Sequence, residues 1–417
     1  MVLEGETPQP LGRNYWRLWS SASLSNLADG VFAVALPLIA IQYTQSPTLI
    51  AGLALAGNLP WLVFALQAGA ISDRKDRRRV MFSANVLRGL LLLVLAAMVA
   101  LDAATIWALY GVVFLAGIAE TLYDTSAQSI LPQVVGRTLL PRANSRLYAA
   151  ELTANEFVGP PLGGFLVTIG AGLVLAGSGS VWLLAALVLL LLRGSYKTDH
   201  DGSTTMRADV AEGLRFLRHH RVLRNMALLT GVGNFAGTAA WSVFVLFAVG
   251  SGSAMGLSEP QYGLLMTATA IGAFVGTFIA EFTQRRLGRS RTLILMIVAI
   301  SASIAAPAFT TNPWVIGAFS AFGGLTIVMG NIVMVSLRQR VTPDRLLGRV
   351  NSAYRMLAWG LMPLGALFGG FFTDWFGFEA LFAVAGLISL STLGCMFALT
   401  NHAIEQAERD ADERDAE

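Results

Sequence analysis

Residues 61–100 read WLVFALQAGAISDRKDRRRVMFSANVLRGLLLLVLAAMVA. Two apolar runs, 49–71 and 80–101, flank a short segment, residues 72–79, that holds most of the local charge. A helix needs about 20 mostly apolar residues to cross the hydrocarbon core of a bilayer. Both runs are long enough, so this stretch predicts two membrane-spanning helices joined by a basic hairpin loop.

The composition of the whole chain indicates a surface that faces lipid. Of its 417 residues, 55% are hydrophobic and only 13% are charged, and the formal net charge is +3. A soluble protein carries roughly 25% charged residues. The positive charge does not indicate nucleic-acid binding, because the basic residues lie in short segments between apolar runs, as in loops held at an anionic leaflet.

Cysteine and histidine usage points away from a metal centre. The single cysteine, Cys395, lies in an apolar run, and the four histidines lie in polar stretches without the spacing of metal ligands. We therefore expect no intrachain disulfide, no metal and no cofactor.

The apolar runs recur along the chain and predict an all-α membrane protein with twelve transmembrane helices. A membrane β-barrel would instead show segments of about ten residues with alternating hydrophobicity. The predicted spans are 17–43, 49–71, 80–101, 104–131, 145–169, 173–193, 223–249, 260–284, 291–310, 313–337, 352–374 and 378–399.

The basic residues predict the orientation of these spans. Every second connection is free of Lys and Arg, whereas the others carry nearly all of them. Basic loops stay on the cytoplasmic side of a membrane. We therefore expect a multi-pass protein of the cytoplasmic membrane with both termini in the cytoplasm. The basic connections are 72–79, 132–144, 194–222, 285–291 and 338–351.

An internal repeat divides the chain into two similar halves. Residues 139–145, LLPRANS, match residues 346–352, LLGRVNS, at an offset of 207, and the same offset maps Gly69 onto Gly276. Parallel repeats of this kind are related by an axis along the membrane normal, with the substrate site where the repeats meet. The repeat predicts two pseudo-symmetric six-helix bundles.

Four regions follow from the repeat and from composition. The segment between the halves contains a basic amphipathic helix expected at the membrane surface, and the acidic tail is expected to be disordered or a solvated helix. The regions are an N-terminal bundle, 1–193, a cytoplasmic linker, 194–222, a C-terminal bundle, 223–401, and an acidic cytoplasmic tail, 402–417.

The basic hairpin loop carries a motif that resembles a known family. Residues 69–79, GAISDRKDRRR, are similar to the G-x-x-x-D-R-x-x-R-R signature of the major facilitator superfamily, which lies between its second and third helices. The segments LADGVFAVALPLIA, LPQVVGRTLLPRANS and EGLRFLRHHRVLRN resemble the macrolide-efflux and enterobactin-exporter branch of its drug–proton antiporters. The resemblance implies a transporter rather than an enzyme, and a twelve-helix fold.

The loop motif predicts a conformational switch made of Gly69, Asp73, Arg74, Arg77 and Arg78. A glycine lets two helices approach closely, and an aspartate is stabilised near a helix N-terminus; we expect that N-terminus to belong to the eleventh helix. The arginines can reach carboxylates or lipid phosphates. The alternative is a basic loop that sets only the topology.

Predicted helix 5 contains Gly159, Pro160, Gly163 and Gly164, which resemble the G-P-x-x-G-G motif of proton-exchanging exporters in the superfamily. Proline bends a helix, and glycine allows close packing. The alternative is a kinked, tightly packed helix with no role in exchange. Many relatives of this type carry an arginine in helix 4, but here helix 4 has Glu120 and Asp124 instead, so a relay through that arginine cannot be transferred.

Three carboxyl groups lie near the midplane of their predicted helices. Asp29, Glu120 and Glu156 are candidates for proton coupling, because acids inside a membrane are costly and usually functional. The alternative for each is a structural hydrogen bond in the protonated form. Arg88 is expected to form a structural ion pair with Asp124 on the neighbouring helix.

The C-terminal half has no acid at midplane depth. Amide, aromatic and methionine side chains can form an adaptable apolar cavity for large ligands. The candidate cavity residues are Asn26, Asn234, Trp241, Phe244, Asn331, Met334, Met356 and Trp359.

These features predict a monomeric secondary transporter that exports a bulky, largely apolar small molecule by proton antiport with alternating access, in contact with membrane lipid. Importers or facilitators of the same fold and a transport-incompetent membrane sensor are the alternatives. An ATP-driven pump is disfavoured because the chain has no G-x-x-x-x-G-K-[ST] segment.

Overall fold

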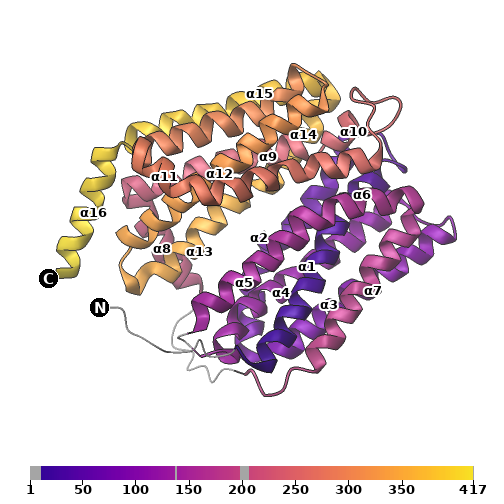
Figure 1. Cartoon of the computed structure of the whole chain (residues 1–417), viewed down its shortest axis with the longest axis horizontal. Coiled ribbons are helices and arrows are strands. Elements are labelled where there is room, and N and C mark those ends of the chain that lie inside the picture. Colours follow the sequence, from indigo (N-terminus) through magenta and orange to yellow (C-terminus); the bar gives the residue numbers. More distant parts are fainter. Residues whose placement is uncertain (1–10, 137–138, 198–205, 417) are drawn as a thin grey trace. The chain divides into compact units, whose positions relative to one another are not determined.

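The computed structural model describes residues 11–136, 139–197 and 206–416. Side chains at 66, 70, 73, 206–210, 344–345 and 414–416 lie outside the description. The described residues are mainly helical and form no β-strand, which confirms the predicted all-α membrane fold (Figure 1). It divides into two units, residues 1–39 with 63–201 and residues 40–62 with 202–417.

The first unit contains the helices of the N-terminal half, except for the first part of α2, which groups with the second unit. The fifth span is interrupted by a short π-helix, η2. The elements of this half are α1 (Gly12–Ala40), α2 (Pro47–Arg74), α3 (Arg77–Ala100), α4 (Ile106–Val134), α5 (Leu140–Leu152), η2 (Thr153–Val158), α6 (Gly159–Ile169) and α7 (Ala171–Leu190).

The second unit contains the remaining helices. They are α8 (Met206–His219), α9 (Arg221–Trp241), α10 (Phe244–Ala248), α11 (Glu259–Ala305), the 3₁₀ turn η3 (Ala306–Ala308), α12 (Pro313–Val341), α13 (Asp344–Gly360), α14 (Met362–Phe376), α15 (Phe378–Ser391), the 3₁₀ turn η4 (Thr392–Ala398) and α16 (Asn401–Ala416).

Nine helices in the described part are long and apolar enough to cross a membrane. Helix α11 counts once but covers two predicted spans, which meet at Gly288, where φ is +78°. The spans predicted at 145–169 and 223–249 are broken into shorter pieces. Nine such helices are therefore consistent with twelve crossings.

The repeat offset of 207 is visible in the helix boundaries. Helix α4, Ile106–Val134, maps onto 313–341, which are the bounds of α12. Close contacts also occur between the corresponding helix pairs of the two units, although not at equivalent residues. A Cβ atom at Gly163 of α6 would lie 2.6 Å from the Val31 carbonyl oxygen of α1, and in the second unit Gly365 of α14 leaves no room for a Cβ against Phe235 of α9.

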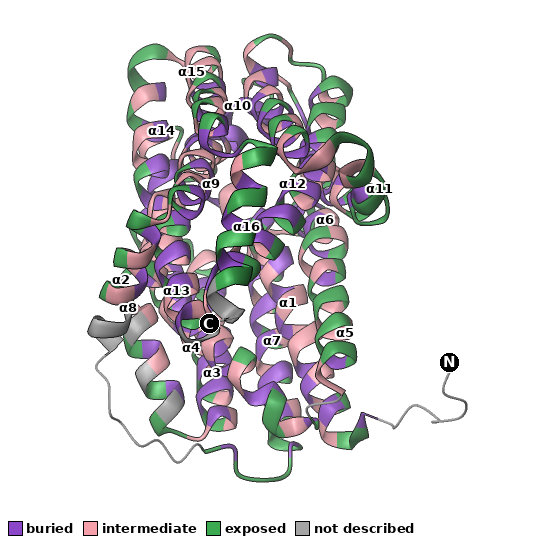
Figure 2. Ribbon diagram, turned by 90° about the vertical axis from the view of Figure 1, so that its left-hand side faces the viewer, coloured by how far each residue is buried: buried purple, intermediate pink, exposed green. Residues whose placement is uncertain are grey.

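Burial differs from that of a soluble protein. Many large apolar side chains are exposed, including Phe278 on α11 and Phe371 and Trp375 on α14. Buried residues gather on one side of most helices, and exposed residues lie on the other (Figure 2). Such apolar exposure fits helices whose outer faces contact lipid.

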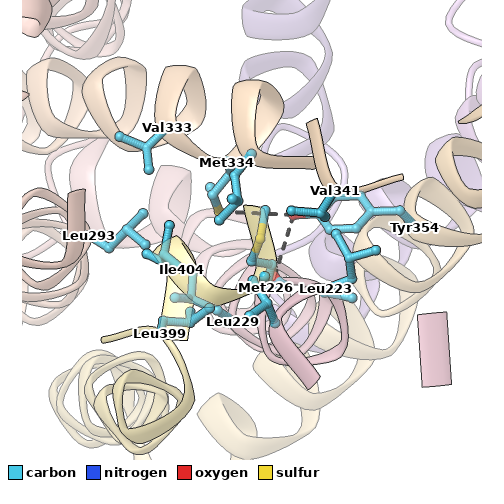
Figure 3. Close-up of a cluster of buried hydrophobic side chains, with 14 of the residues drawn as sticks. Leu223, Met226, Leu229, Leu293, Val333, Met334, Val341, Tyr354, Leu399 and Ile404 are labelled. Atoms are coloured by element: carbon cyan, nitrogen blue, oxygen red, sulfur yellow. Dashed lines mark hydrogen bonds between the residues drawn. The ribbon is translucent and has the colours of Figure 1, made fainter. Parts of the chain in front are cut away.

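The apolar core of the second unit includes the C-terminal tail. Met226, Leu293, Met334 and Tyr354 come from α9, α11, α12 and α13, and Ile404 from α16 packs among them (Figure 3). The acidic tail is thus a helix with one packed face, rather than a disordered or fully solvated segment.

The amphipathic helix predicted between the halves is α8. Leu217 is buried, Gly213 lies against the backbone of Arg349 in α13, and Arg349 forms an ion pair with Glu212. The apolar face of α8 therefore packs on protein, whereas the sequence predicted contact with the membrane surface.

Candidate functional site

The first unit contains a charged cluster inside the helix bundle. Arg88 of α3 is only 2% exposed and forms an ion pair with Asp29 of α1. The Glu120 carboxylate on α4 lies 3.8 Å from the same guanidinium group. One buried arginine is therefore shared by carboxylates from two other helices.

The partner predicted for Arg88 was wrong. The ion pairs described for this guanidinium involve Asp29 and Glu120, and Asp124 contributes only to its electrostatic surroundings. Asp124 lies one turn beyond Glu120 on the same face of α4, so the position of Arg88 along the axis of α4 decides which acid meets the arginine.

Trp182 of α7 completes the cluster and was not among the predicted site residues. The Arg88 guanidinium carbon lies 4.1 Å from the centre of the Trp182 ring, and Trp182 is fully buried. An arginine over an aromatic face gains cation–π attraction, which is stronger away from water. Trp182 therefore helps to hold the positive charge in an apolar environment.

Glu156 lies on a different part of the bundle. It belongs to the π-helix η2, next to Asn155, whose side chain donates to the Asn26 side-chain oxygen over 3.3 Å. Within the described residues, no hydrogen bond or ion pair joins Glu156 to Arg88. π-Helical turns are frequent at functional sites, and the Asn26–Asn155 contact ties this one to α1.

The helix-5 motif packs directly beside Asp29. Gly159 faces Gly30, where a Cβ atom would lie 2.6 Å from the Gly30 Cα atom, and Gly163 faces Val31. Gly159, Pro160, Gly163 and Gly164 are the start of α6, just after the π-helix. The motif therefore sets the separation of α1 and α6 at the level of the charged cluster.

The predicted switch residues lie at the junction of α2 and α3. Arg77 donates to the Ser129 carbonyl oxygen of α4 over 2.7 Å, and Arg78 donates to the Leu192 carbonyl oxygen over 2.5 Å. Both arginines thus bind backbone oxygens near helix C-termini, where positive charge is favourable. Gly69 and Arg74 lie on α2, and the side chain of Asp73 lies outside the description.

The second unit encloses a separate cavity of about 730 Å³. Its walls come from the first part of α2 and from α9, α11, α12, α13 and α15. No charged residue lines it within the described part of the chain. The polar lining residues are Thr230, Asn234, Thr238, Ser242, Thr269, Ser303, Ser320, Asn331, Ser389 and Thr392.

Five of the predicted cavity residues line this cavity, namely Asn234, Trp241, Asn331, Met334 and Trp359. The other three lie elsewhere. Phe244 is fully buried in an aromatic cluster, and the centre of its ring lies 4.7 Å from that of Trp241. Met356 is 41% exposed outside the cavity lining, and Asn26 belongs to the first unit.

Sequence comparison identifies the family of the chain. Residues 7–415 match the transmembrane secretion effector family, so the chain belongs to this family of the major facilitator superfamily. The multidrug efflux pump Tap of Mycolicibacterium fortuitum is 28% identical over 384 residues, 88% of this chain and 91% of that protein. The enterobactin exporter EntS of Escherichia coli O1:K1 / APEC is 26% identical over 343 residues, 79% of this chain and 78% of that protein.

Solved structures show the same fold. Nucleoside transporter NupG has a TM-score of 0.71 at 13% identity, covering 93% of this chain and 99% of that one. A bacterial homologue of the iron transporter ferroportin, in an inward-facing state, has a TM-score of 0.70 at 18% identity and covers 93% and 99%. The family match and the sequence relatives identify the chain as a multi-pass membrane transporter and not an enzyme.

Proposed function

We propose that this transporter exports a bulky, largely apolar and uncharged small molecule across the cytoplasmic membrane in exchange for protons. The observation that carries the proposal is the sharing of the buried Arg88 between Asp29 and the more exposed Glu120. The proposed direction of transport and type of ligand are supported by the relatives, which include a multidrug efflux pump and an enterobactin exporter.

The charge balance of the cluster favours a proton as the coupling ion. One guanidinium group can neutralise one carboxylate, so two carboxylates beside Arg88 leave an excess negative charge. Uncompensated charge inside a membrane protein is costly, and a bound proton removes it. When Asp29 takes the proton, its attraction for Arg88 weakens, and the arginine can turn toward Glu120 on α4.

Such an exchange of partners can be linked to alternating access. Asp29 lies on α1 beside the tight contact between Gly30 and Gly159, and Glu120 lies on α4. Moving the arginine between two helices changes which helices are held together. Proton binding and ligand binding are then coupled when each favours a different state of the same two-state equilibrium.

The uncharged cavity supplies the ligand site in this proposal. Its volume of about 730 Å³ is within the roughly 300–1,000 Å³ of small-molecule sites. The Asn331 amide is exposed and makes no hydrogen bond to the described residues, so it is available to a polar group of the ligand. Met334, Trp241 and Trp359 provide apolar surface that can adapt to different ligands.

The function is tested in proteoliposomes with an imposed pH gradient and a panel of neutral and cationic fluorescent compounds. We expect a neutral apolar compound to accumulate against its own gradient and to stop accumulating when the pH gradient is collapsed. Accumulation that ignores the pH gradient would indicate a facilitator, and no transport of any compound would favour a sensor.

The orientation is tested separately with a single new cysteine. Ser195→Cys in a Cys395→Ser background places one thiol after α7, in the segment expected on the cytoplasmic side. In intact cells this thiol should resist an impermeant maleimide and react only after permeabilisation. Reaction in intact cells would reverse the proposed topology.

A further inference from the structure

A strongly basic pocket of about 910 Å³ lies in the first unit, at the α2–α3 junction and beside the segment that follows α7. Five cationic side chains and one carboxylate line it. Membrane-spanning transporters place basic residues near anionic leaflets, and here such residues are exposed around a hollow. The charged lining residues are Arg74, Lys75, Asp76, Arg78, Arg79 and Lys197.

The one carboxylate in the pocket is already used by the backbone. Asp76 caps α3, accepting from the backbone N–H of Arg79 over 3.2 Å and from that of Tyr196 over 3.1 Å. Arg78 is directed to the Leu192 carbonyl oxygen. The remaining four cations, those of Arg74, Lys75, Arg79 and Lys197, form no ion pair with any described residue, and the described lining has an excess of positive charge.

The matching region of the second unit does not have this excess. The repeat offset maps Arg74 onto Glu281 and Lys75 onto Phe282. Arg285, the counterpart of Arg78, pairs with Glu281 over 2.5 Å. The second unit thus pairs Arg285 with a carboxylate of its own, at the position where the first unit has the cation of Arg74.

The tail helix adds to that neutralisation. Arg289 of α11 lies 2.5 Å and Arg340 of α12 lies 3.7 Å from the Glu408 carboxylate of α16. A basic loop needed only for topology would satisfy the positive-inside rule equally well if its cations were paired. The four cations of the first unit that form no ion pair with a described residue are exposed and are therefore available to an anion from outside the chain.

The pocket also has an apolar side. Val80 and Phe82 of α3 and Leu190 of α7 line it together with the cations, and Leu190 is 53% exposed. The apolar side of the pocket is therefore continuous with the membrane-spanning parts of α3 and α7. A ligand that combines an anionic phosphate ester with an acyl chain would match both sides.

We propose that this pocket binds the phosphate group of an anionic membrane phospholipid, with the cations around the phosphate and the acyl chains along α3 and α7. The proposal is independent of the transported ligand and of proton coupling. A lipid held there would join the loop between α2 and α3 to the segment after α7, both of which contribute cations to the pocket.

The test uses native mass spectrometry of the full chain in detergent, with phosphatidylglycerol as the probe and phosphatidylcholine as the zwitterionic reference. The pocket variant is the triple change Lys75→Gln, Arg79→Gln and Lys197→Gln, which leaves the helix cap and Arg78 in place. The matched control removes the same charge from the second unit through the triple change Arg285→Gln, Arg286→Gln and Arg291→Gln.

We expect the pocket variant to bind phosphatidylglycerol about tenfold or more weakly, while the control binds it as the native chain does and phosphatidylcholine binding is unchanged in both. Equal losses in the two variants, or no loss in either, would overturn the proposal, because the charge would then act without a defined site. Displacement of the lipid by millimolar inorganic phosphate would overturn the lipid assignment in favour of a free phosphate ion.

Discussion

The two halves of the chain share one scaffold but use its interior in different ways. In the first half, Arg88, Asp29 and Glu120 form a charged cluster packed on Trp182. The repeat offset of 207 maps these four positions onto uncharged residues of the second half, namely Leu295, Ala236, Ile327 and Ser389.

Two of these counterparts, Ile327 and Ser389, line the cavity of the second half. Asp124 also has an uncharged counterpart in the lining, Asn331. Replacing a tryptophan by a serine leaves a large volume unfilled, and replacing the arginine and acids removes the need to pair charges. After duplication, the same location in the fold can therefore serve as an ionic centre in one half and as a ligand-sized cavity in the other.

The strongest test of this division removes the acid that pairs with Arg88. Asp29→Asn should lower pH-driven transport about 100-fold, in the upper range of coupling between two sites, because the cluster no longer binds a proton. Exchange of ligand at equal pH should persist. The measurement compares the two modes in proteoliposomes, with Glu120→Gln and Glu156→Gln made in parallel.

The control for this prediction is Glu281→Gln, an exposed acid on α11, which should transport like the native chain. Full pH-driven transport in all three acid variants would show that the first half does not handle protons. A loss of pH-driven transport only in Glu156→Gln would indicate that proton coupling takes place at the π-helix instead.

A second test asks whether the cluster also stabilises the first half. Arg88→Ala leaves the partly buried Asp29 without its ion-pair partner and should lower the free energy of unfolding by about 2–3 kcal/mol. Thermal unfolding in detergent provides the measurement. The double change with Asp29→Ala should recover part of the loss, whereas the double change with Asp124→Ala should recover less; the reverse order would restore Asp124 as the main partner.

A third test introduces into the cavity the tryptophan that the first half has at the equivalent position. Ser389→Trp should fill part of the 730 Å³ cavity and raise the KM for a bulky ligand about tenfold, without affecting proton coupling. Ser391→Trp, on an exposed position of α15, is the matched control. Because a tryptophan can disturb packing, Asn331→Asp is tested as a second variant. It should weaken the binding of neutral ligands and strengthen the binding of cationic ones.

An unchanged KM and ligand preference in both Ser389→Trp and Asn331→Asp, with folded protein, would place the ligand site outside this cavity. The transport assay is run with one neutral and one cationic compound, so that a change in charge preference is separated from a loss of space.

The smallest expected effect concerns the tail helix. Glu408→Gln breaks the contacts with Arg289 and Arg340 and should cost about 1 kcal/mol or less, since both arginines are partly exposed and screened by salt. The loss in unfolding temperature should shrink at high ionic strength. Asp412→Asn, at a more exposed acid, should cost less still; an equal cost would mean that the acidic face acts only through its net charge.

The fold class was predictable from local sequence alone. Apolar runs of membrane length, basic loops and a repeat at one offset require only counting along the chain, and the matching bounds of α4 and α12 agree with that offset. The same signals predicted which residues are unusual, because an arginine or acid inside an apolar run stands out whatever it contacts. Five of the eight expected cavity residues were also found at one cavity.

Which polar groups meet was decided only by the tertiary structure. A helix in lipid has apolar residues on its outer face as well as on its inner face, so hydropathy does not reveal its rotation. Asp29 and Arg88 are 59 residues apart in sequence, and a turn of α4 separates Glu120 from Asp124. Helix packing therefore determines the partner of Arg88, its contact with Trp182 and the cavity that Ser389 lines. The sequence of each helix by itself does not determine that packing.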